Sequence, residues 1–186
     1  MGLFDALFGR TRPVQPKPEG IYELPSAAVS LEVLFDLKPE GRAGVCFKPI
    51  PTHHFREVEE EMREMLTCAS DEGTSFHTHM DALGYQWVLL EGGGVESLVT
   101  ALASVVDALE DAGYADKLVC ALFPFRDGKR AYLVYNYKRG TFYPFVPSGS
   151  HERDAEMELK IASLMRDELT LERDESRWYP IWDAPI

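Results

Sequence analysis

Three cysteines and two closely spaced histidines are the residues of this chain whose types could support nucleophilic or metal chemistry. Cys46, Cys68 and Cys120 are far apart and lack the C-x-x-C spacing of zinc and redox motifs. His77 and His79 would share one face of a strand, which suits two imidazole ligands, but no third ligand follows at a recognisable spacing. We therefore expect packed, reduced thiols and exposed strand histidines, with no catalytic residue, no metal site and no cofactor.

Three consecutive glycines, Gly92 to Gly94, separate an expected strand from an expected helix and could expose backbone donors to a phosphate. No Gly-Lys-Ser/Thr ending and no G-x-G-x-x-G pattern accompanies them. Glu91 and Glu96 flank the turn with charges that repel an anion. A flexible connection is the better interpretation of this run.

A basic and aromatic stretch between residues 117 and 140 contrasts with the acidic remainder of the chain. It holds six Lys or Arg against one acid, Asp127, whereas the whole chain has 19 basic and 31 acidic residues and a net charge of −12. That net charge argues against a nucleic-acid partner. The side chains that we expect to contact a partner are Lys129, Arg130, Lys138, Arg139, Phe142 and Tyr143.

Three interpretations of these basic residues remain open. They could bind an acidic helix, RNA or lipid headgroups. Alternatively, they could protect an edge strand and pair with the acidic helices expected over residues 55–66 and 154–168. In the third interpretation, a small-molecule-binding domain or an enzyme would hold an anion near Cys46. Its pocket would be lined by Arg42, Lys48, Lys138 and Arg139.

The elements that position these residues follow from apolar periodicity and turn residues. Helices are expected from Pro25 to Leu37, from Thr52 to Leu66, between Gly94 and Gly113, and from Ser150 to Leu169. Strands are expected at 43–48, 74–80, 85–91, 118–125 and 130–138, the last two joined by an Asp-Gly turn. This order predicts an α+β fold, a mainly antiparallel five-stranded sheet with helices packed on it, in a single domain.

Two further packing expectations concern the first helix and the end of the chain. The first helix is expected to bury Val29, Val33, Leu34 and Leu37. The aromatic segment from Arg177 to Ile186 is expected to pack on the domain, because so much apolar surface is unfavourable in water.

The N-terminal segment is set apart from the expected domain. Residues 1–20 form an apolar segment and a proline-rich linker, and residues 21–186 form the domain. We expect this segment to dock on a membrane, on a partner or on its own domain. Its docking residues are Leu3, Phe4, Leu7 and Phe8.

Four sequence strings resemble one protein family in the same order along the chain. They are GLFDALFGR at the start, GRAGVCFKP from Gly41, KRGTFYPF from Lys138 and RWYPIWDAPI from Arg177. Together they resemble the phage-shock-protein-A-associated proteins of the PspAB type. The resemblance implies a cytoplasmic protein linked to PspA, a coiled-coil protein of the membrane (envelope) stress response, with peripheral contact at the inner membrane left open. It brings no established reaction or catalytic residue.

The function expected from these observations is that of a non-enzymatic adaptor or regulatory partner of a PspA-type stress response, acting through protein–protein contacts. The alternative is the anion-binding domain or enzyme with a pocket around Arg42, Lys48 and Lys138. A deep cleft holding those groups would favour the alternative, and a flat, patchy surface would favour the adaptor.

Overall fold

A computed structural model describes residues 15–69 and 74–186 of the chain. Its α-helices are α1 (Leu24–Phe35), α2 (Thr52–Ala69), α3 (Val95–Asp111) and α4 (Ala155–Leu164). Its strands are β1 (Lys38–Pro39), β2 (Arg42–Phe47), β3 (Ser75–Met80), β4 (Gln86–Glu91), β5 (Leu118–Asp127), β6 (Lys129–Asn136), β7 (Thr141–Phe145), β8 (Pro147–Gly149) and β9 (Glu152–Arg153). Short 3₁₀ turns cover Pro18–Glu23, Ala115–Lys117 and Glu175–Arg177.

One antiparallel sheet organises the domain. Its strands run in the order β3-β4-β2-β5-β6-β7, and β1 pairs with β5 as the seventh strand. The prediction of a single α+β domain with a mainly antiparallel sheet is confirmed, but the prediction of five strands is wrong. The five expected strands are all present, and the sheet gains β1 and β7. Pro144 lies inside β7, and a proline, which cannot donate to the ladder, hides an edge strand from sequence patterns.

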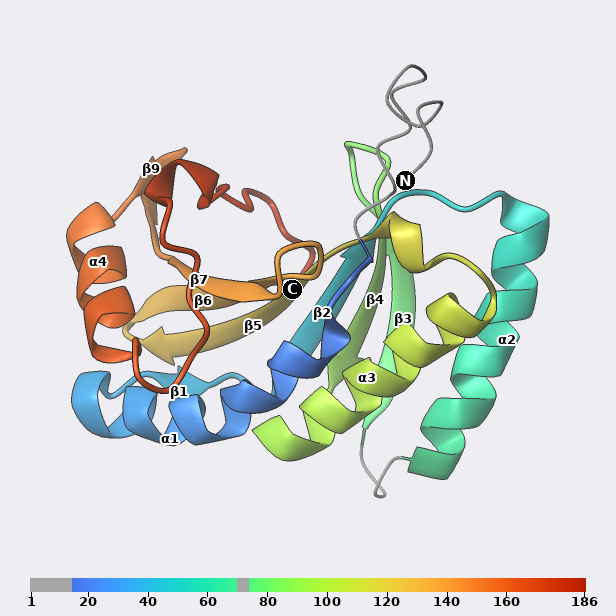
Figure 1. The fold of residues 1–186 in the computed structure, drawn as a ribbon, viewed down its shortest axis with the longest axis horizontal. Helices are drawn as coiled ribbons and strands as arrows, with labels where there is room; N and C mark the ends of the chain where they lie inside the picture. The colour runs from blue at the N-terminus through green and yellow to red at the C-terminus, as the bar shows by residue number, and fades with distance from the viewer. Residues whose placement is uncertain (1–14, 70–73) are drawn as a thin grey trace, which may run out of the picture.

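The two faces of the sheet are covered by different parts of the chain. Figure 1 shows α1, α2 and α3 on one side of the twisted sheet and the C-terminal segment beside β6 and β7. Alternation along the strands divides the buried side chains accordingly. Val45 and Leu133 join the core with the helices, whereas Cys46 and Val134 join the second core with Trp178.

The first helix buries a different face from the expected one. Val29, Val33 and Leu34 are exposed by 63%, 77% and 54%, so that prediction is wrong for them, and only Leu37 of the expected set is buried. The buried face of the helix consists instead of Leu24, Ala27, Ala28, Leu31 and Phe35. Alanines allow a close approach to the neighbouring α3, and apolar periodicity alone did not distinguish this face.

The C-terminal segment packs on the domain, as expected. Trp178 and Ile186 are buried, while Tyr179 remains exposed. Arg153 Nη1 donates to the Trp178 carbonyl at 2.8 Å, and the Tyr143 hydroxyl donates to the Tyr179 carbonyl at 3.0 Å. Side chains of β7 and β9 therefore hold the segment over the second core.

Among the residues that the structure describes, no helix is long and apolar enough to cross a membrane.

Candidate functional site

The four expected contact cations lie at opposite ends of β6. Lys129 and Arg130 begin the strand, whereas Lys138 and Arg139 lie in the turn that follows its last residue, Asn136. With eight residues in β6 and about 3.3 Å per residue, the two pairs are roughly 25 Å apart. They form two separate surfaces. We call these the hairpin end (Lys38, Glu40, Arg42, Arg126, Lys129 and Arg130) and the basic end (Lys17, Lys138, Arg139 and Arg173).

The two aromatic contact residues are in the interior. Phe142 and Tyr143 are exposed by 0% and 2%, so their side chains do not reach the surface and the expectation for them is corrected. Phe142 packs against Tyr135, with ring centroids 4.7 Å apart. The segment after α4 covers β7, because the Phe142 amide donates to the Thr170 carbonyl at 2.8 Å. The side chains of Phe142 and Tyr143 therefore belong to the two hydrophobic cores, one to each.

The hairpin end is organised by one carboxylate. The Glu40 side chain is 9% exposed and receives Arg126 Nε at 2.8 Å, Arg130 Nη2 at 2.9 Å and the guanidinium of Arg42. Burial by itself raises the pKa of Glu40. The hydrogen bonds from Arg130 and Arg42 and the nearby positive charges outweigh this effect and hold the pKa below its ordinary value.

Every cation of the hairpin end has a partner within the protein. Besides the three arginines on Glu40, Lys129 lies 3.6 Å from Asp154 and Lys38 lies 3.4 Å from Asp36. Arg130 also donates to the Ile186 carbonyl at 3.1 Å, which ties the C-terminal segment to the sheet. The basic residues of this end therefore do pair within the same protein, but of the two acidic helices expected as partners only the second contributes, through Asp154, and β6 is not an edge strand. Glu40 was missed because 90 residues separate it from Arg130 in the sequence.

The basic end surrounds an open depression of about 740 Å³. Its charged lining residues are Lys138, Arg139, Arg173 and Glu172, three cations and one carboxylate. Arg139 Nη1 lies 3.3 Å from Glu172, whereas Lys138 and Arg173 form no ion pair with any residue that the structure describes. A hollow with two unneutralised cations favours a negatively charged partner.

The backbone next to this depression is shaped by Gly140, whose φ of +68° is readily adopted only by glycine. A Cβ at this position would lie 2.8 Å from the side chain of Lys17, so that lysine packs over the turn. The Lys17 amide donates to the Tyr137 carbonyl at 2.8 Å. The described part of the expected linker thus contributes a cation to the basic end.

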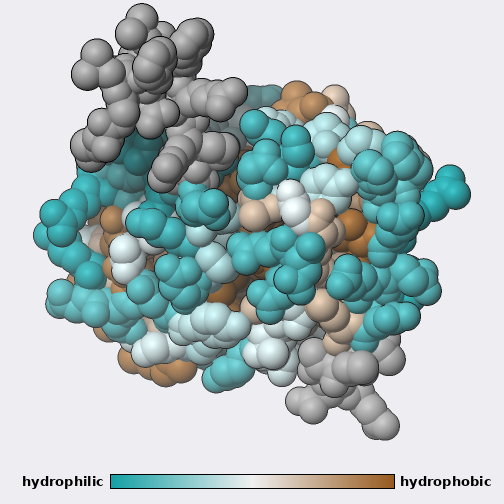
Figure 2. Space-filling view, turned by 45° about the vertical axis from the view of Figure 1, so that its right-hand side comes forward, coloured by the Kyte–Doolittle hydropathy of each residue, from teal (hydrophilic) through white to brown (hydrophobic). Residues whose placement is uncertain are grey.

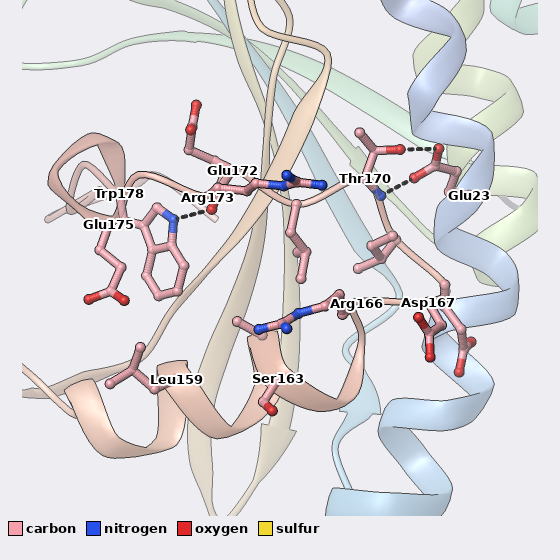
Figure 3. Close-up of a pocket in the computed structure, with 14 residues that line it drawn as sticks. Glu23, Leu159, Ser163, Arg166, Asp167, Thr170, Glu172, Arg173, Glu175 and Trp178 are labelled. Carbon is pink, nitrogen blue, oxygen red and sulfur yellow. Dashed lines mark hydrogen bonds between the residues drawn. The ribbon is translucent and has the colours of Figure 1, made fainter.

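A larger groove of about 850 Å³ also borders the segment that follows α4. Figure 3 shows Thr170 bonded to Glu23 at one end of this groove and the Trp178 indole bonded to the Glu172 carbonyl at the other. Arg166 and Arg173 line it together with several acids, Glu23, Asp167, Glu168, Glu172 and Glu175. This mixture of signs gives the groove no preference for an anion.

The expected anion pocket beside Cys46 does not form. Arg42 and Lys48 lie at opposite ends of β2, Cys46 is buried between them, and neither cation lines either depression. Only Lys138 and Arg139 of the expected set lie together. That arrangement is therefore wrong, because at about 3.3 Å per residue the length of the strand places Arg42 and Lys48 roughly 20 Å apart.

His77 and His79 are exposed on the edge strand β3, and no group of three or more His, Cys, Asp or Glu able to hold a metal occurs among the described residues. Leu3, Phe4, Leu7 and Phe8 lie outside the described residues. Figure 2 shows hydrophilic side chains over much of one face, with apolar surface in separate patches.

Comparison with known proteins gives one informative result. No curated protein and no solved structure matches the chain. A family model described as PspAB, PspA associated protein B, matches residues 1–186, the whole chain. The chain therefore belongs to the PspA associated protein B family.

Proposed function

We propose that this protein is a non-enzymatic adaptor or regulatory partner of a PspA-type membrane stress response and acts through protein–protein contacts. The observation that carries the proposal is the match to the PspA associated protein B family over the whole chain. The proposed setting is the cytoplasm, with contact to the inner membrane through the partner or through the N-terminal segment.

The contacts of three carboxylates with little exposed surface support a structural rather than a catalytic role for them. Glu40 holds three arginines at the hairpin end. Glu158, 2% exposed, binds Arg153 at 2.8 Å and accepts the Val146 amide at 2.8 Å. Glu172 accepts the Asp174 amide at 3.1 Å and pairs with Arg139. Each group joins chain segments and is already engaged with a cation, unlike a free general acid or base.

The basic end is the proposed contact surface. Its Lys138 and Arg173 have no ion-pair partner in the described part of the chain, in contrast to the cations of the hairpin end. An acidic stretch of a partner helix laid across the 740 Å³ depression would supply the missing negative charges. Because exposed charges are screened by salt, this contact is expected to weaken as ionic strength rises.

The experiment is a binding titration between the full chain and a PspA-like coiled-coil protein from the same organism. The double variant Lys138→Ser/Arg173→Ser is compared with Lys38→Ser/Lys129→Ser, which removes the same charge from the other end of the sheet. We expect weakened binding of the first variant at low ionic strength and near wild-type binding of the second. Equal effects of the two variants would argue against the basic end, and no binding by the wild-type chain would refute the adaptor role.

A further inference from the structure

Cys46 and Cys120 face each other across the two central strands of the sheet. They are directly opposed in the antiparallel register of β2 and β5, and both belong to the second core, on the face under the C-terminal segment. The two side chains are close enough for Cys120 to raise the pKa of the Cys46 thiol. The sequence separation of the two residues concealed this pair, since no spacing motif links them.

The register brings the two residues within reach of a disulfide bond. Opposed residues of antiparallel strands have Cα atoms about 4.5 Å or about 5.5 Å apart, and a disulfide tolerates about 4.4 to 6.8 Å. Two opposed side chains on the same face therefore need no large backbone movement to be joined. The register of β2 and β5 also shifts immediately after Cys46, and such bulges are frequent beside functional positions.

The C-terminal segment contributes Trp178 and Ile186 to the core that buries this pair. Both cysteines are 4% exposed. Gly44, two residues before Cys46 on the same face of β2, has no side chain, and a Cβ there would lie 3.4 Å from the Ile186 side chain. Ile186 thus packs over Gly44, on the face of β2 that carries Cys46. Among the described residues, its carbonyl is held by Arg130 at 3.1 Å.

The reduced pair is protected while the cover is in place. The neighbouring Cys120 side chain, together with burial, raises the pKa of the Cys46 thiol well above its ordinary value. Because the thiolate is the reacting species, the closed structure slows thiol exchange. Displacement of residues 183–186 would admit both water and a small reagent to the pair.

We propose that Cys46 and Cys120 are a reversible thiol-oxidation site that forms a cross-strand disulfide with low-molecular-weight disulfides as the oxidant. This inference is independent of the proposed adaptor role, because it concerns the opposite face of β2 from the helices and none of the basic end.

The chemistry is two successive thiol–disulfide exchanges. One cysteine thiolate attacks a sulfur of the reagent RSSR, breaks its S–S bond and releases RS⁻, which leaves a mixed disulfide on the protein. The second cysteine thiolate then attacks the protein sulfur of that mixed disulfide and releases the second RS⁻. The two thiol protons end on the two RS⁻ groups. In total, the dithiol loses two electrons and RSSR is reduced to two RSH.

The test uses the full chain with Cys68→Ser, so that only the two thiols in question remain. The protein is equilibrated in a glutathione redox buffer without denaturant and alkylated, and its intact mass is measured by mass spectrometry. We expect an oxidised, monomeric form that lacks two hydrogens, takes up no alkyl groups and returns to the dithiol with dithiothreitol. The control, Cys46→Ser/Cys68→Ser, cannot form this species.

The role of the cover is tested with a chain lacking residues 183–186, checked for folding by circular dichroism. If that chain does not fold, Ile186→Gly takes its place. We expect oxidation about tenfold faster than in the full-length protein, the change in thiolate fraction that one unit of thiol pKa produces. Two free thiols in the native full chain after oxidation would overturn the proposal, whatever the shortened chain does. Equal oxidation rates would overturn the role of the C-terminal cover.

Discussion

Replacement of Glu40 by glutamine tests the hairpin end most sharply. The change removes the one carboxylate that Arg42, Arg126 and Arg130 share and leaves three guanidinium groups close together. Breaking a fully buried ion pair costs about 3 to 5 kcal/mol. The arginine side chains are 28% to 50% exposed, and solvent screening reduces that figure. We therefore expect a loss of roughly 2 to 3 kcal/mol in the free energy of unfolding.

The pH dependence of this effect follows from the lowered pKa of Glu40. A carboxylate whose pKa is lower in the folded than in the unfolded protein stabilises the fold above its unfolded pKa, here near 4.5. That contribution is lost as the pH falls through the folded pKa. The difference in stability between wild type and Glu40→Gln should therefore be full at neutral pH and shrink in strong acid.

Urea unfolding followed by circular dichroism, at neutral pH and in strong acid, measures this difference in the free energy of unfolding. Glu57→Gln, on the exposed face of α2, is the control for the loss of one negative charge. A loss below about 0.5 kcal/mol at neutral pH, the range of ordinary surface substitutions, would refute the reasoning. A difference that stays constant into acid would refute it as well.

Three further predictions concern stability and docking. Deletion of residues 1–9 should leave the unfolding midpoint unchanged and weaken binding to liposomes or to the partner, whereas a marked loss of stability would place the segment in the core. Deletion of residues 177–186 should lower the melting temperature and cost about 3 to 5 kcal/mol, since Trp178 and Ile186 leave the second core; an unchanged melting temperature would contradict this. Tyr137→Phe should raise the free energy of unfolding by about 1 kcal/mol in urea, because the buried Tyr137 hydroxyl makes no hydrogen bond with the described residues. A loss of stability on that change would mean that the hydroxyl has a partner.

Local patterns predicted the elements of the fold well. The Asp-Gly turn between β5 and β6 and the helix bounded by Gly94 and Gly113 both appear in the structure, because each depends on residues close in sequence. The buried face of α1 was not predictable in this way. An apolar stripe of Val29, Val33 and Leu34 satisfies helical periodicity, but the neighbouring elements decide which stripe is covered.

The candidate surfaces were predictable only in part. The charge contrast of the stretch from 117 to 140 correctly pointed to exposed Lys138 and Lys129. Its division into two ends depends on the length of β6, which a count of charges ignores. The roles of Glu40 and of the Cys46–Cys120 pair arise from long-range strand pairing, and neither has a signal in local sequence.

The charge balance at the basic end explains why salt dependence is informative for the adaptor role. Two unneutralised cations at one depression would attract an acidic helix, and the effect of removing them should be largest where screening is weakest.

The most direct measurement of the central claim is the dissociation constant of the full-length protein with the PspA-like coiled-coil protein of its organism, measured by calorimetry at low and at physiological ionic strength. The adaptor role predicts saturable binding that weakens with salt and is further weakened by Lys138→Ser/Arg173→Ser. No heat of binding at low ionic strength, with both proteins folded, would contradict it.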